Sequence, residues 1–186
     1  RVIGGTKFYE RAEIKDSVAF LRIVNQKNDD LAFERIINVP KRAIGDSTLK
    51  QLHNWGRANK KSLEDSAIEL IQLNKIKPKA KLGMVKILGM FTKWRNDLNK
   101  KKHYELMEII LDESGYSKML KDKKDLESEG RLENLKELIR GMNEFDNLQS
   151  FLEHVALATS IDQDWNGQKV NLMTIHAAKG LEFDAV

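Results

Sequence analysis

The sequence predicts a mainly α-helical protein, in which a multi-helix subdomain is inserted into part of an α/β domain. Through the middle of the chain, apolar residues recur every three or four positions, which is the period of an amphipathic helix. The two ends instead hold short apolar runs followed by glycine loops, at residues 2–5 and 170–180. Such runs are typical of strands that end in loops. We therefore expect parts of one α/β domain at residues 1–29 and 167–186, and an all-helical subdomain at residues 30–166.

Composition bounds the class of protein. The chain has 186 residues, of which 41% are hydrophobic and 32% charged, enough to bury one core of fair size. It has no cysteine, which excludes disulfides and thiolate metal sites and fits a reducing cytoplasm. No stretch of about 18 apolar residues and no signal-peptide pattern is present. We expect a cytoplasmic protein with no membrane partner.

Charge is distributed unevenly along the chain, although the net charge is only +4. Residues 35–61 hold seven Lys/Arg and one acid, and residues 75–102 hold ten Lys/Arg and one acid. Residues 105–164 reverse the sign, with fifteen Asp/Glu and seven Lys/Arg. A basic half joined to an acidic half favours a polyanion such as nucleic acid as the partner of one side only. Solvated helix faces are the alternative explanation for each run alone.

Helix signals divide the first half of the chain. A helix is expected at about 11–26, and a second one, capped near Asp29, should end before Pro40 because the residue before a proline avoids the α region. A third helix should be capped by one of residues 46–48. Ser62 opens a capping-box pattern before a fourth helix.

The second half of the chain continues the helical pattern. A long helix should run from Pro78 to about 102, and Trp94 is expected in the core rather than as a base-stacking platform. Shorter helices are expected at 104–112, 116–124, around 132–142 and at 148–158, followed by an exposed linker at 160–169. The predicted buried face of the long helix consists of Leu82, Val85, Leu88, Phe91, Trp94 and Leu98.

The basic turn before the third helix is the main candidate site. Lys41 and Arg42 flank a glycine-containing turn that leads into a helix N-terminus. Exposed backbone N–H groups and the helix dipole favour an anion there without reading any base. A purely structural helix–turn–helix junction is the alternative.

Three segments resemble the UvrD/Rep/PcrA family of superfamily 1 DNA helicases. Residues 170–183, VNLMTIHAAKGLEF, match every fixed position of the family's motif V, V-x-L-M-T-x-H-x-A-K-G-L-E-F. Residues 4–16, GGTKFYERAEIKD, resemble a second family segment, and residues 37–48, INVPKRAIGDST, resemble its N-x-P-x-R-G-I-G segment. Ala43 departs from the last pattern, in which glycine is usual. If that position requires a positive φ, alanine costs on the order of 1 kcal/mol; if φ is negative, the change is harmless.

The resemblance implies roles for particular residues. Residues 1–29 and 167–186 would belong to a RecA-like 2A domain, and residues 30–166 would be the helical 2B subdomain. Lys7, Thr174 and His176 would contact single-stranded DNA, and Gly180 and Glu182 would contact ATP. The duplex would be contacted by Lys41, Arg42, Ile44, Gly45, Ser47 and Thr48.

The implied parent is an ATP-dependent 3′–5′ helicase that binds ATP and Mg²⁺ and acts on single-stranded and duplex DNA in repair or replication. Repair or transcription proteins are possible partners. The sequence itself has no G-x-x-x-x-G-K-(S/T) loop, no catalytic triad and no ligand-spaced histidines. We therefore predict no catalytic residue and no metal site in it, and no stable cofactor binding by this segment alone. The alternative is a helical protein-interaction or regulatory module of a helicase or helicase–nuclease, without DNA contacts of its own.

Overall fold

Helix α2 (Ala12–Asn25) lies at the centre of the structure, a computed structural model that describes residues 6–160. It packs against α1, α3, α6, α7, α9 and α10. One helix can meet so many others because apolar residues surround most of its circumference. The buried apolar residues of α2 are Ile14, Ala19, Phe20, Leu21, Ile23 and Val24.

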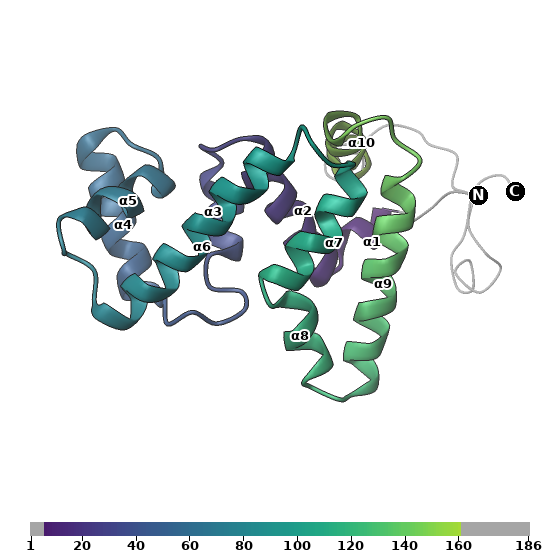
Figure 1. The fold of residues 1–186 in the computed structure, drawn as a ribbon, viewed down its shortest axis with the longest axis horizontal. Helices are drawn as coiled ribbons and strands as arrows, with labels where there is room; N and C mark the ends of the chain where they lie inside the picture. The colour runs from purple at the N-terminus through teal and green to yellow at the C-terminus, as the bar shows by residue number, and fades with distance from the viewer. Residues whose placement is uncertain (1–5, 161–186) are drawn as a thin grey trace, which may run out of the picture.

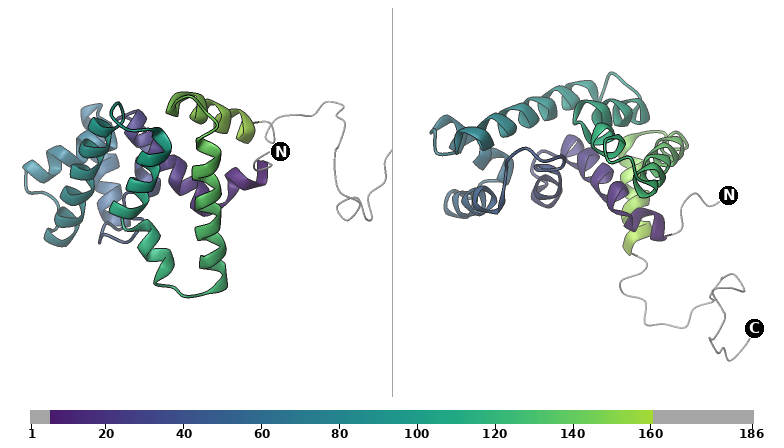
Figure 2. Two further views of the ribbon diagram at one scale, coloured as in Figure 1. Left: turned by 45° about the vertical axis from the view of Figure 1, so that its right-hand side comes forward. Right: turned by 90° about the horizontal axis from the view of Figure 1, so that it is seen from below.

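Figure 1 shows the other helices arranged around α2 in two groups. The pair α4 and α5 lies at one end, α7, α8 and α9 lie at the other, and α6 runs between them. The view from below in Figure 2 shows α6 along one side of α2 and α3. In chain order the helices are α1 (Thr6–Glu10), α2, α3 (Asp30–Ile36), α4 (Asp46–Asn59), α5 (Leu63–Gln72), α6 (Pro78–Asp97), α7 (His103–Glu113), α8 (Tyr116–Lys121), α9 (Leu126–Met142) and α10 (Leu148–Ser160).

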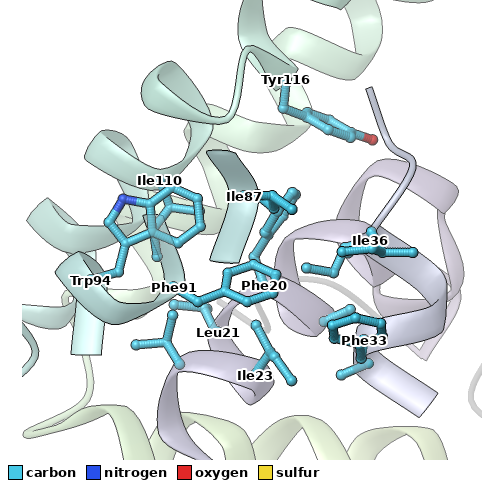
Figure 3. Close-up of a cluster of buried hydrophobic side chains, with 14 of the residues drawn as sticks. Phe20, Leu21, Ile23, Phe33, Ile36, Ile87, Phe91, Trp94, Ile110 and Tyr116 are labelled. Atoms are coloured by element: carbon cyan, nitrogen blue, oxygen red, sulfur yellow. The ribbon is translucent and has the colours of Figure 1, made fainter. Parts of the chain in front are cut away.

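A cluster of aromatic rings joins these helices at the core (Figure 3). The ring of Phe20 lies edge-on to Trp94 on α6, at 6.0 Å between centroids, and edge-on to Tyr116 on α8, at 6.3 Å. Phe91 contacts Phe33 of α3 in the same way, at 6.3 Å. Edge-to-face pairs add to the free energy of burial. The prediction that Trp94 belongs to the core is confirmed.

The predicted mainly helical class is confirmed, and no strand lies among residues 6–160. Two predicted caps are also confirmed. The side chain of Asp29 accepts a hydrogen bond from the N–H of Ala32 at the start of α3, and that of Ser62 accepts one from Asp65 at the start of α5. The division at residue 29 stays a prediction, since the strands expected of a RecA-like part fall outside the described residues.

Some helix limits differ from prediction. A short helix, α1, precedes the helix expected at about 11–26, and α10 continues to Ser160, where the linker was expected to start. Helix α6 ends at Asp97 rather than near Lys102, because Lys102 already caps α7. The part of the linker beyond residue 160 lies outside the described residues.

The predicted buried face of α6 is wrong in its first half. Leu82 and Val85 are 74% and 50% exposed, whereas Met84 and Ile87 are fully buried. The helix has apolar residues on two faces, and the smaller Ala80 and Gly83 lie against its neighbours. Close packing favoured the side with small residues, which a count of apolar positions does not reveal.

Substitutions on the two faces of α6 should have different effects on stability. Met84→Ala removes a fully buried side chain and should lower the free energy of unfolding by roughly 2–5 kcal/mol. The matched variant Leu82→Ala removes a side chain that is mostly exposed and should change it by about 0.5 kcal/mol or less. Urea unfolding of both variants measures this. A larger loss for Leu82→Ala would mean that the originally predicted face is the buried one.

Candidate nucleic-acid interface

The segment between α3 and the first turn of α4 holds all six residues predicted to contact a duplex, and the structure divides them by exposure. Lys41, Gly45 and Ser47 are exposed, and Arg42 is partly buried. Ile44 is fully buried and Thr48 is 6% exposed. The exposed residues can therefore contact a ligand directly, while the buried side chains pack under the turn and hold it in place.

The side chain of Arg42 points into the protein. Its Nη1 donates to the carbonyl oxygens of Ile36, Ile37 and Pro40 at 3.1, 3.2 and 3.1 Å, and its Nη2 donates to that of Ser114 at 3.1 Å. Burial lowers the pKa of the guanidinium to about 10, so it remains protonated at neutral pH. The carbonyls lie at the ends of α3 and α7, where helix dipoles favour a cation. The guanidinium is already occupied by protein acceptors, which argues against a direct duplex contact of Arg42. That contact stays a prediction.

Two further residues fix the backbone of the turn. Oδ1 of Asn38 accepts hydrogen bonds from the N–H groups of Arg42, at 2.7 Å, and Ile44, at 3.2 Å. On the other side, Gly83 of α6 lies so close that a Cβ there would be 2.3 Å from the carbonyl oxygen of Arg42. Any larger residue would push α6 and the turn apart. Sequence reasoning missed both residues; only Asn38, four positions before Arg42, carried a local signal.

Ala43 lies in the left-handed region of the backbone, with a φ of 61°. The sequence left open whether this position needs a positive φ, and the structure shows that it does. Alanine pays a steric cost in this region that glycine does not. The departure from the glycine pattern is therefore a local strain of about 1 kcal/mol.

Helix α4 begins without a side-chain cap. Gly45 is its N-cap, with a φ of −97°, and its carbonyl accepts from the N–H groups of Thr48 and Leu49. The prediction that one of residues 46–48 caps the helix is wrong, because Asp46 is already helical. Uncapped N–H groups of the first turn suit an anion, while the exposed carboxylate of Asp46 opposes one beside it.

The other residues with predicted DNA or ATP contacts cannot be placed relative to this surface from the described residues. Lys7 lies in α1, with its side chain outside the described part of the structure. Thr174, His176, Gly180 and Glu182 lie outside the described residues altogether. Within residues 6–160 no group of three His, Asp or Glu could hold a metal ion, and no helix is long and apolar enough to span a bilayer.

A groove of about 830 Å³ between α2, α3 and α10 forms a second surface that the sequence did not predict. Its wall includes Leu31, which is 75% exposed, together with Leu152 and Ala156 of α10. Lys15, Arg22 and other charged side chains surround these apolar residues. No sequence signal marked it, because α10 meets α2 only in the folded chain.

Comparison with known proteins gives consistent matches over the whole chain. The model of the UvrD-like helicase C-terminal domain matches residues 1–186. A probable DNA helicase II homolog of Rickettsia conorii is 38% identical over 189 residues, covering 100% of this chain and 29% of the relative. The ATP-dependent DNA helicases PcrA of Bacillus subtilis and Staphylococcus aureus are 38% and 36% identical, again over 100% of this chain. The chain spans only 27% and 26% of their lengths.

The strain at Ala43 predicts a stabilising substitution. Ala43→Gly should raise the free energy of unfolding by up to about 1 kcal/mol, because glycine adopts a positive φ without a steric cost. The control is Ala58→Gly on the exposed surface of α4, which should lower it by about 0.5–1 kcal/mol. Thermal or urea unfolding gives both values. Equal losses for the two variants would show that Ala43 is unstrained.

The carbonyl contacts of Arg42 predict that lysine cannot replace it. Arg42→Lys should lower the free energy of unfolding by about 2 kcal/mol, because one ammonium group cannot reach four carbonyls arranged around a planar fork. Arg57→Lys, at an exposed arginine of α4, serves as the control and should be nearly neutral. Matching urea midpoints for the two variants would argue against a structural role for Arg42.

Proposed function

Because the chain belongs to the family of UvrD-like helicase C-terminal domains, we propose that it is the DNA-contacting helical part of an ATP-dependent DNA helicase. The matched relatives are named as DNA helicases, and three separate family-like segments occur in the expected order along this chain. In this proposal the parent protein moves 3′ to 5′ along single-stranded DNA and unwinds the duplex ahead of it, in DNA repair or replication.

The observation that carries the DNA contact is the fixed turn before α4. The internal bonds of Arg42 and Asn38 hold its backbone in one conformation, which leaves Lys41, Gly45 and Ser47 exposed. An ammonium group, a hydroxyl group and a backbone N–H are sequence-independent donors to phosphate oxygens. We propose that these three residues contact the duplex backbone, and that Arg42, Ile44 and Thr48 contribute by holding them in place.

The other DNA and nucleotide roles follow from the family pattern. Lys7, Thr174 and His176 would bind the backbone of single-stranded DNA, and Gly180 and Glu182 would bind ATP, with Mg²⁺ held by other parts of the parent. Alternation between nucleotide states would change the affinity of the parent for the single strand. The chain alone holds no phosphate-binding loop, so we propose that it does not hydrolyse ATP by itself.

A protein-interaction module is the second candidate, and the groove between α2, α3 and α10 is the observation that favours it. Its apolar wall around Leu31 could receive a repair or transcription protein. This candidate predicts no DNA contact at the turn. A test of Lys41 therefore separates the two functions.

Lys41→Ala in the full-length protein should weaken binding to a blunt duplex and reduce the dependence of log Kd on log salt by about one, because one phosphate contact is lost. ATP-dependent unwinding of a duplex with a 3′ single-stranded tail should slow in parallel. The free energy of unfolding should not change, because the Lys41 side chain is exposed and has no ion pair among the described residues.

Lys136→Ala on α9 provides the control, since it removes the same charge from the acidic half of the chain. It should leave both DNA measurements unchanged. Unaltered duplex binding in the Lys41 variant would refute the contact at the turn and favour the protein-interaction module. Failure of the unmodified protein to unwind the tailed duplex would refute the helicase function itself.

A further inference from the structure

The first half of α6 lies directly beside the turn, and its basic residues are exposed there. The contact point is Gly83, whose backbone touches that of Arg42. Lys79 lies four positions before Gly83 and Lys86 three positions after it, so both lie on the same side of the helix as this contact. Both side chains are exposed. They therefore flank the turn, one on each side of the place where α6 meets it.

Lys79 and Lys86 differ from the other cations of α6 in having no partner among the described residues. Lys81 donates to Asn74, Lys93 pairs with Glu113, and Arg95 makes two hydrogen bonds of 2.6 Å with Glu64. No hydrogen bond or ion pair involves the ammonium of Lys79, Lys86 or Lys41 in residues 6–160. Acids thus neutralise Lys93 and Arg95 in the second half of α6, whereas Lys79 and Lys86 near the turn stay unpaired.

Spacing lets the two lysines meet different phosphates. Seven residues of helix separate them, a rise of about 10 Å. Each flexible side chain extends the reach of its charge further, and an ammonium group binds phosphate as a point charge without a fixed orientation. Asp46, in the first turn of α4, is the one acid in the segment 41–48, a single negative charge against three cations.

We propose that Lys79 and Lys86 bind phosphates of duplex DNA beside the turn, so that α6 is a second element of the duplex-binding surface. The inference rests on the proposed function and extends it from one loop to a loop and a helix. Lys41, Lys79 and Lys86 then form one sequence-independent phosphate-binding surface, which we call the α6–turn surface. The close packing of Gly83 against the backbone of Arg42 places the helix directly against the turn.

The test is the salt dependence of binding by the full-length protein to a blunt duplex. Lys79→Ala with Lys86→Ala should reduce the slope of log Kd against log salt by about 1.8, at about 0.9 per lost phosphate contact. Binding to a single strand of the same length should keep its slope. If the alanine variant folds poorly, Lys79→Gln with Lys86→Gln removes the same charges and keeps longer side chains.

The matched control is Lys100→Ala with Lys101→Ala. These two exposed lysines follow the opposite end of α6 and contribute the same charge. Their removal should leave the duplex slope unchanged. An equal reduction in both double variants would overturn the proposal, because it would show an effect of net charge alone.

Comparison with Lys41→Ala separates this inference from the proposed function. A reduced slope for Lys41→Ala with none for the Lys79 and Lys86 variant would overturn the role of α6 and leave the contact at the turn intact. Unchanged slopes for all of these variants would overturn both. Reduced slopes for Lys41 and for Lys79 with Lys86, and not for the control, would establish the α6–turn surface.

Discussion

The buried guanidinium of Arg42 is the interaction on which the geometry of the candidate interface depends. A cation inside a protein is costly unless acceptors surround it, and the carbonyls at the ends of two helices supply these acceptors. Because Ser114 lies 72 residues after Arg42, this one side chain fixes the turn relative to the α7–α8 junction. The same contacts explain why Lys41 projects outward. Because the Arg42 side chain points into the protein, the neighbouring side chain of Lys41 faces the solvent.

Helix α2 uses acidic side chains in a comparable way. The carboxylate of Glu13, 3% exposed, accepts from Nδ2 of Asn134 on α9 at 2.6 Å. Asp16 accepts from Nε of Arg35 and from the hydroxyl of Tyr116, both at 2.7 Å. Burial and this carboxylate raise the pKa of Tyr116, so the phenol remains a donor. In the described structure, the acids of the N-terminal family-like segment therefore connect helices.

The sequence predicted most helices because propensity, caps and apolar period are local properties. It failed where the outcome depended on distant residues. The face of α6 was decided by close approach at Gly83, and the inward turn of Arg42 by a carbonyl far along the chain. For the candidate site, the segment and its exposed lysine were predictable from charge and glycine. The division into supporting and exposed residues was not, because Arg42 and Lys41 look alike in a sequence.

Ion pairs in the folded chain make the charge distribution more uneven than in the sequence. On α9, Arg131 pairs with Glu127 and Lys136 with Glu133, so the acidic half neutralises part of its own charge along one helix. Acids of α5 and α7 neutralise the cations of α6 that lie far from the turn, since Arg95 pairs with Glu64 and Lys93 with Glu113. At physiological salt, exposed charges act over only about 8 Å, so a net charge of +4 spread over the surface would attract a polyanion weakly. Attraction requires unpaired cations gathered on a rigid support. The packing of Gly83 against Arg42 provides this support, because it holds α6, with its two unpaired lysines, beside the turn that carries a third.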